Sequence, residues 1–158
     1  MTWHRITLAL AALTALGALP ADLRAQQKCA DDPAYAVLDF WVGEWDVMAG
    51  DRQVGHNRIE KILDGCAITE LWTNAGGGEG RSLFYRVPSE DAWKQVWVTA
   101  NPYRPGGVKE KRLIERLDGG GVLFRGEIAA SDGRAVLDQT RLIPVGDGTV
   151  RQIIEMST

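Results

Sequence analysis

Short extended segments separated by turn-forming residues dominate the chain after residue 43. The breaks between them, such as "AGDR", "NAGGGEG", "LDGGG" and "VGDG", carry the glycine, aspartate and asparagine that tight turns require. Regular short strands joined by such turns favour an antiparallel all-β meander, sandwich or barrel over a parallel sheet. We expect strands at about 44–49, 53–63, 67–73, 81–87, 92–100, 108–117, 121–129, 134–143 and 149–156.

Several of these strands carry a polar residue between two apolar ones on the same face. In "AWKQVWVTA", Trp93, Gln95 and Trp97 share a face, because side chains alternate along a strand. In "AITELWT", Glu70 lies in the same way between an isoleucine and a tryptophan. A simple sandwich shows cleaner alternation, so this pattern favours a small barrel whose interior is partly a cavity.

The segment before the first strand, "DDPAYAVLDFWVG", predicts a short helix. Asp31 or Asp32 could cap it, and Pro33 suits its first turn. The following "FWVGEWDV" would end this helix and open the first strand, with Gly43 allowing the backbone to turn. We expect Trp45 to cover one end of the barrel as a residue of the fold rather than of a binding site.

Two interpretations fit the polar residues between the aromatic ones. As a core network they would fix the strand register, because a buried charge without partners is costly. As the floor of a pocket they would orient the polar group of a ligand. Arg141 could pair with Glu70 in either case, and Gln152 or Glu155 could complete the network. The candidate ligand-binding residues are Glu70, Trp72, Tyr85, Trp93, Gln95, Trp97, Arg141 and Gln152.

The start of the chain has the pattern of a secretory signal peptide. Arg5 makes it basic, an apolar run covers 6–19, and Ala25 is a small residue suited to cleavage. The run is short for a membrane anchor, although an uncleaved anchor or a buried helix is the alternative. We expect residues 1–25 to be removed and residues 26–158 to form one periplasmic or secreted domain without an integral membrane segment.

The two cysteines, Cys29 and Cys66, both follow the expected leader. An exported chain with two cysteines most simply forms one disulfide, and two unpaired thiols are the alternative. Their spacing does not suggest a zinc site, because His56 is the only histidine after the leader. We expect neither a metal nor a cofactor.

The charge balance and the missing catalytic motifs narrow the function further. The chain has a net charge of −3, and nucleic-acid binding is not expected because it requires a basic surface. His56 and Glu60 share a strand face and could act as an acid–base pair, but Arg58 between them suggests a solvated face. Without a nucleophile motif, we expect no enzyme, and a hydrolase or isomerase using Glu70 or His56 is a lesser alternative.

The motifs "FWVGEWDV", "HNRIEKILDGCAITELW", "GRSLFYRV", "WKQVWVTAN" and "VRQIIEMS" occur in this order from about Phe40 to the end. With the G-x-W of "GEW", the set resembles the lipocalin-like, or calycin, barrels, and within them a bacterial branch of exported proteins without an assigned activity. The resemblance implies an antiparallel up-and-down barrel with a possible cavity and the carriage of a small apolar molecule. Haem-binding relatives use a histidine near the C-terminal end, and no histidine follows His56 here.

Proteins of this kind usually continue past "EMS" with a glycine-containing turn, a tryptophan and a final strand. We therefore expect either a barrel with fewer strands or a longer sequence. With fewer strands, an unpaired edge beside the first strand would invite dimerisation, so the protein is expected to be a monomer or a homodimer. The leading hypothesis is a non-enzymatic exported barrel that binds a small, largely apolar ligand. The alternative is a structural or interaction module with a packed interior.

Overall fold

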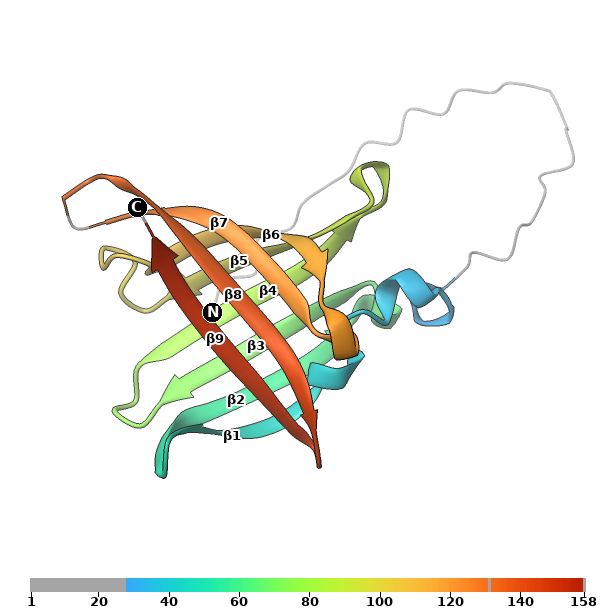
Figure 1. Ribbon diagram of the computed structural model, residues 1–158, viewed down its shortest axis with the longest axis horizontal. Coiled ribbons are helices and arrows are strands. Elements are labelled where there is room, and N and C mark those ends of the chain that lie inside the picture. Colours follow the sequence, from blue (N-terminus) through green and yellow to red (C-terminus); the bar gives the residue numbers. More distant parts are fainter. Residues whose placement is uncertain (1–27, 131, 158) are drawn as a thin grey trace, which may run out of the picture.

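The computed structural model describes residues 28–130 and 132–157, which form one antiparallel sheet of nine strands. Each strand pairs with the next along the chain, so the order in the sheet is the order in the sequence (Figure 1). The strands are β1 (Gly43–Ala49), β2 (Arg52–Ile62), β3 (Ala67–Asn74), β4 (Glu79–Val87), β5 (Ala92–Thr99), β6 (Val108–Arg116), β7 (Val122–Ala129), β8 (Ala135–Gly146) and β9 (Thr149–Ser157).

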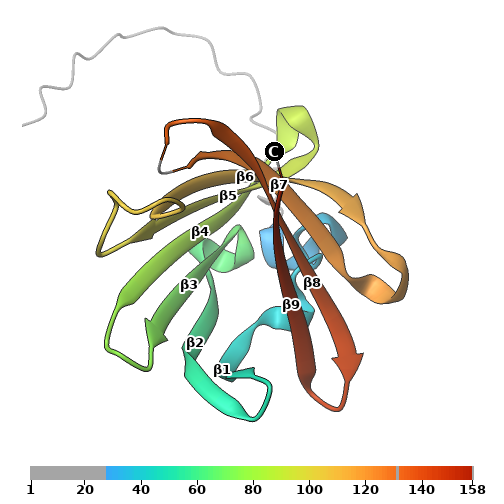
Figure 2. The same ribbon diagram turned by 60° about the vertical axis from the view of Figure 1, so that its left-hand side comes forward.

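The sheet curls into a half-barrel with β1 and β9 as the outer strands of the order (Figure 2). The prediction of an all-β, antiparallel, up-and-down architecture is therefore confirmed. Every expected strand is present with ends within a few residues of the predicted ones, and β8 extends furthest beyond its prediction, to Gly146. The expected leader, residues 1–25, lies outside the described residues.

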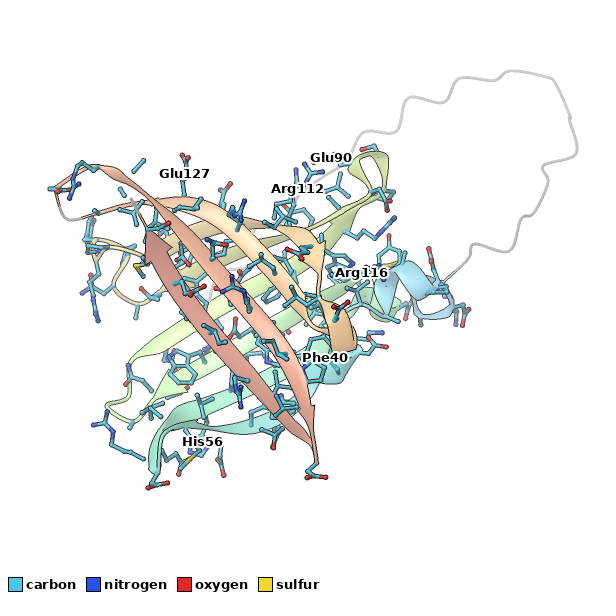
Figure 3. All side chains as sticks on the ribbon, viewed as in Figure 1. Phe40, His56, Glu90, Arg112, Arg116 and Glu127 are labelled. Carbon is cyan, nitrogen blue, oxygen red and sulfur yellow. A yellow bond between two sulfur atoms is a disulfide. The ribbon has the colours of Figure 1, made fainter. Side chains whose placement is uncertain are left out.

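The predicted N-terminal helix is replaced by three short 3₁₀ turns: η1 (Cys29–Asp31), η2 (Pro33–Tyr35) and η3 (Asp39–Trp41). Tyr35 of η2, Leu38 between the turns, and Trp41 of η3 are buried. Phe40, labelled in Figure 3, packs partly against the same core. The predicted cap is present, because the backbone N–H of Ala34 donates to Oδ1 of Asp32 at 2.8 Å.

Three further 3₁₀ turns connect strands: η4 (Leu63–Gly65), η5 (Pro88–Glu90) and η6 (Asp118–Gly120). All of the helical elements between residues 28 and 157 that the structure describes are three residues long. None of them is long and apolar enough to cross a membrane.

Apolar side chains fill the interior at the end covered by η3. The rings of Trp41 and Phe84 meet edge to face with centroids 5.2 Å apart, and Phe84 meets Phe124 in the same way at 5.5 Å. Leu38 and Leu142, both almost inaccessible to solvent, complete this end. Such aromatic pairs contribute stability beyond the area that they bury, so this end of the half-barrel is a true core.

Trp45 belongs to the same packed end. Its indole N–H donates to the backbone oxygen of Trp41 at 2.9 Å, which ties β1 to η3. Gly43 precedes it with a φ of +146°, and a Cβ at Gly43 would lie 3.8 Å from Nε1 of Trp45. The backbone thus turns into β1 in a conformation that favours glycine, and the indole packs against the core.

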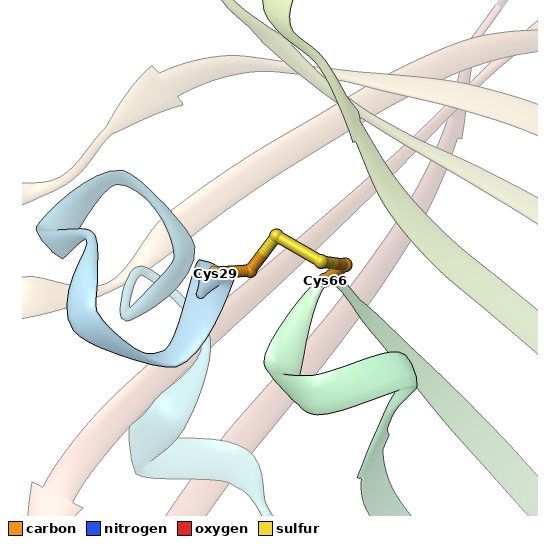
Figure 4. The surroundings of a disulfide bond; sticks show 2 residues. All are labelled: Cys29 and Cys66. Carbon is orange, nitrogen blue, oxygen red and sulfur yellow. A yellow bond between two sulfur atoms is a disulfide. The ribbon is translucent and has the colours of Figure 1, made fainter. Parts of the chain in front are cut away.

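A disulfide joins Cys29 in η1 to Cys66 at the start of β3 (Figure 4). It closes a loop over a sequence separation of 37 residues and attaches the N-terminal turns to the β2–β3 connection. Gly65, with a φ of +86°, lies beside Ala30 so closely that a Cβ would be 3.1 Å from its Cα. The predicted pairing of the two cysteines is therefore present in the structure.

Candidate functional site

A cavity of about 430 Å³ lies on the inner face of the half-barrel, beyond the packed end. The loop between β5 and β6 forms part of its rim, and residues of eight strands, all but β7, form its walls. This volume falls within the range of small-molecule sites, roughly 300–1,000 Å³. The lining residues that the sequence pattern singled out are Glu70, Trp72, Gln95, Trp97 and Gln152.

The two tryptophans of the cavity wall lie over glycines of neighbouring strands. A Cβ on Gly80 of β4 would lie 2.2 Å from Cη2 of Trp97, and one on Gly55 of β2 would lie 2.4 Å from Cη2 of Trp72. Trp72 is also the register partner of Gly80. The glycines therefore leave the space that the indole rings occupy: β2 provides it for Trp72 and β4 for Trp97.

Glu70 lines the same cavity as the two tryptophans, and both of its carboxylate oxygens accept hydrogen bonds. Nδ2 of Asn57 donates to Oε1 at 2.8 Å, and the hydroxyl of Ser82 donates to Oε2 at 2.6 Å. Nε2 of Gln95 donates to the same hydroxyl at 3.1 Å, so one chain of bonds crosses β2, β3, β4 and β5. Burial raises the pKa of Glu70, and the bonds from Ser82 and Asn57 oppose that rise.

A second polar cluster lies on β6 and β8. Asp138 is fully buried between two lysines: Nζ of Lys111 lies 2.5 Å from Oδ1 and Nζ of Lys109 lies 2.6 Å from Oδ2. Lys111 also donates to the hydroxyl of Thr140 at 2.5 Å. Burial lowers the pKa of Lys111, against the hydrogen bond and charge of Asp138, which raise it.

The two polar clusters form one belt, because Gln95 and Lys111 are register partners on β5 and β6. Along β3, Glu70 separates buried Ile68 of the core from Trp72 of the cavity. Along β5, Gln95 separates a core tryptophan from Trp97 in the same way. The belt therefore divides the interior into a packed end and an open end.

Comparison with protein-family models, curated proteins and solved structures finds no match to this chain. The kind of ligand that the site could bind is therefore inferred from the residues that line it. Those residues offer an aromatic wall, amide and carboxyl groups, and two ammonium groups that share one carboxylate.

Three of the sequence-predicted candidates lie away from the cavity. Trp93 is in the core, where its indole N–H donates to the backbone oxygen of Ala34 at 3.0 Å and its ring meets Tyr35 edge to face. Tyr85 follows the buried Phe84 and so faces the other side of the sheet. The third is Arg141 of β8, which was expected near Glu70.

Arg141 pairs with Glu155 on the neighbouring strand β9, at a short contact, rather than with Glu70. Both side chains lie on the outer side of the half-barrel, since Thr140 and Leu142 on either side of Arg141 are buried. Ser82 and Asn57 instead provide the bonds that Arg141 was expected to give to Glu70.

His56 lies outside the cavity near the β1–β2 hairpin (Figure 3). Its Nδ1 is 2.9 Å from Oδ1 of Asp46, and both side chains are about 70% exposed (70% and 69%). Glu60 pairs with Arg58 instead of with His56. Among residues 28–130 and 132–157, no group of histidine, cysteine, aspartate and glutamate side chains is arranged to hold a metal.

Sequence reasoning missed Lys109 and Lys111 as residues of the interior. In "VKEKRLIER" the opposite face carries Val108 and Ile114, so ordinary patterning assigns the lysines to solvent. The structure reverses this: Val108 and Ile114 are 49% and 43% exposed, whereas Lys111 is buried. The available signal was the alternation of the two lysines on one strand face, together with Asp138 as the single acidic residue of β8.

Proposed function

We propose that the protein is a non-enzymatic, lipocalin-like carrier that binds one small, largely apolar molecule in the cavity of the half-barrel. The observation that carries this proposal is the open end of the interior, about 430 Å³ in volume and walled by Trp72 and Trp97. Concave sites with aromatic walls and a few directed polar groups are typical of small-molecule binding.

The glycines beneath the rings support the same proposal. Gly55 and Gly80 hold the indoles in place before any ligand arrives, because a different ring position would leave the space over the glycines empty. A wall that is already ordered reduces the entropy cost of binding. Glu70 and Gln95, fixed by their hydrogen bonds, would give a bound molecule a defined orientation.

Export to the periplasm or the medium is part of the proposal. The disulfide between Cys29 and Cys66 supports it, because such bonds persist in oxidising compartments. The up-and-down strand order and the G-x-W segment at the start of β1 support the lipocalin-like assignment.

A structural module with a packed interior is the alternative function. The aromatic core around Phe84 agrees with it, and the bonded polar belt could serve only to fix strand register. It gives no reason, however, for two tryptophans that line an open space beyond the belt.

Tryptophan fluorescence during a titration with a fatty acid, a sterol, an isoprenoid and haem tests the carrier proposal. We expect at least one of these to change the emission of the wild-type protein. Trp97→Phe should reduce the change, and Trp45→Phe, at the packed end, should leave it intact. No emission change across the panel would favour the structural alternative.

A further inference from the structure

The β6–β8 side of the interior carries more positive than negative charge. Asp138 is the common partner of Lys109 and Lys111, so one carboxylate faces two ammonium groups. Each lysine lies within 2.6 Å of a different oxygen of that carboxylate. The three side chains together therefore leave one positive charge without a counterion inside the cluster.

Of the two lysines, Lys109 has N–H donors that remain available for a ligand. Lys111 is 3% exposed and donates to both Asp138 and Thr140. Lys109 is 13% exposed, lines the cavity, and has Asp138 as its ion-pair partner. An ammonium group has three donors, so Lys109 can offer hydrogen bonds to a molecule in the cavity without giving up Asp138.

The rim next to Lys109 adds a second cation. A Cβ on Gly106 would lie 3.5 Å from Nζ of Lys109, which places this ammonium beside the β5–β6 loop. Arg104 of the same loop lines the cavity and is exposed. Within the described part of the chain no acidic side chain lies in ion-pair distance of Arg104.

The other acidic groups of the cavity do not offset this charge. Both oxygens of Glu70 are bonded, to Asn57 and Ser82, and neither lies within ion-pair distance of Lys109 or Arg104. Glu79 at the rim is 59% exposed and pairs with Arg81 at 3.5 Å. Near the β5–β6 loop, Lys109 therefore shares its one carboxylate with Lys111, and Arg104 has no ion-pair partner among the described residues.

We propose that the ligand of this cavity is an amphiphile with a single anionic group, most simply a carboxylate, that accepts hydrogen bonds from Lys109. Its apolar body then lies against Trp72 and Trp97, and Arg104 attracts the anion at the rim. This inference rests on the proposed carrier function and adds the charge of the ligand to it. An ammonium group bonded to a carboxylate in a site with little water binds more strongly than one paired on the surface.

Three probes with the same alkyl chain test the charge preference: decanoate, 1-decanol and decyltrimethylammonium, each below its micelle concentration. Binding is measured by calorimetry on the wild-type protein and followed by tryptophan emission. We expect decanoate to bind about tenfold more tightly than 1-decanol, since a hydrogen bond to a charged group contributes about that factor. Decyltrimethylammonium should bind more weakly than either.

Substitutions then show which residues contact the carboxylate of decanoate. Lys109→Gln should weaken decanoate binding about tenfold and 1-decanol binding by a clearly smaller factor, because the neutral hydroxyl loses only an uncharged acceptor's bond. Arg104→Gln, at an exposed position, should weaken decanoate binding by a smaller factor, roughly threefold, because exposed charges are screened. Lys94→Gln is the matched control, because Lys94 pairs with Glu90 outside the cavity.

The outcomes separate this inference from the function on which it rests. If none of the three probes binds, the carrier proposal itself fails. If decanoate and 1-decanol bind equally, or if Lys109→Gln weakens both alike, the carrier proposal stands and the anionic ligand is ruled out. Should Lys109→Gln not fold, Lys109→Arg, which keeps the charge, must retain the decanoate preference, and Arg104→Gln must reduce it.

Discussion

Trp97 lies directly over Gly80 of the neighbouring strand: a Cβ on that glycine would fall 2.2 Å from Cη2 and 2.5 Å from Cζ2 of the indole. No real Cβ contact is so short, so any side chain at position 80 must move the ring. Trp72 is the register partner of the same glycine, but its ring lies over Gly55 of β2, so each ring of the cavity wall has its own glycine.

Gly80→Ala should therefore displace Trp97 and destabilise the protein by about 1–3 kcal/mol, the usual cost of overpacking an ordered site. The measurement is urea unfolding followed by circular dichroism. The tryptophan emission of the folded variant should also shift, because an indole leaves its ordered position. Ligand binding in the cavity should weaken with it.

A double-mutant cycle shows whether the ring is the cause. In a Trp97→Ala background, Gly80→Ala should cost much less, because the space beside the glycine is then empty. An equal cost in both backgrounds would mean that the glycine matters for its backbone rather than for the indole.

Replacement of Glu70 by glutamine should change how stability depends on pH. Burial raises the pKa of Glu70 above its usual value of 4.5, so the folded protein binds this proton more tightly than the unfolded chain. The stability contributed by the protonated group is complete below the unfolded pKa and is lost as pH rises through the folded pKa. Glu70→Gln should therefore gain stability relative to wild type as pH increases above about 4.5.

Urea unfolding of both proteins at several pH values between about 4 and 7 measures this difference. Glu127→Gln is the control, because Glu127 lies exposed on the outside of β7 (Figure 3). A stability difference between wild type and Glu70→Gln that does not vary with pH would contradict the raised pKa.

The strands were predictable because their signals are local. Alternation within a strand and glycine or aspartate in the turns depend only on neighbouring residues, and all nine strands appear near their predicted positions. The prediction of an N-terminal helix was wrong because the conformation of this segment depends on its contacts with the sheet, which are distant in sequence. Tyr35, Leu38 and Trp41 reach the core from η2, from the link between η2 and η3, and from η3, so packing against the sheet rather than the local pattern decides this segment.

The candidate site was predictable only in part. Glu70 and Gln95 were found because apolar residues flank them on one strand face: an isoleucine and a tryptophan for Glu70, and two tryptophans for Gln95. Lys109 was missed because its strand places valine and isoleucine on the face that the structure exposes. The role of Gly80 depends on a ring from another strand, and a single strand's sequence contains no information about that neighbour.

Lys111→Met should destabilise the protein by about 3 kcal/mol, the lower end of the cost of removing one partner from a buried ion pair. We expect the lower end of this cost because Asp138 still has Lys109 as an ion-pair partner after the substitution. Urea unfolding measures the change. Lys94→Met, which breaks a pair with exposed Glu90, is the matched control and should cost less than about 1 kcal/mol.

The combination of Lys111→Met with Asp138→Leu gives a second check on this cluster. Asp138 is also the partner of Lys109, so the double variant leaves that ammonium without its carboxylate and should be less stable than Lys111→Met alone. Additive losses would show that each side chain contributes separately, through packing.

Reduction of the Cys29–Cys66 bond should lower the free energy of unfolding by about 3–4 kcal/mol, the loop-closure value for a loop of this length. The bond attaches η1 to the β2–β3 connection, so its loss frees the N-terminal turns that carry Leu38 and Trp41 into the core. Urea unfolding with and without reductant measures the effect. The Cys29→Ser/Cys66→Ser protein should match the reduced wild type and show no response to reductant, whereas a reductant effect on that variant would place the cause outside the disulfide.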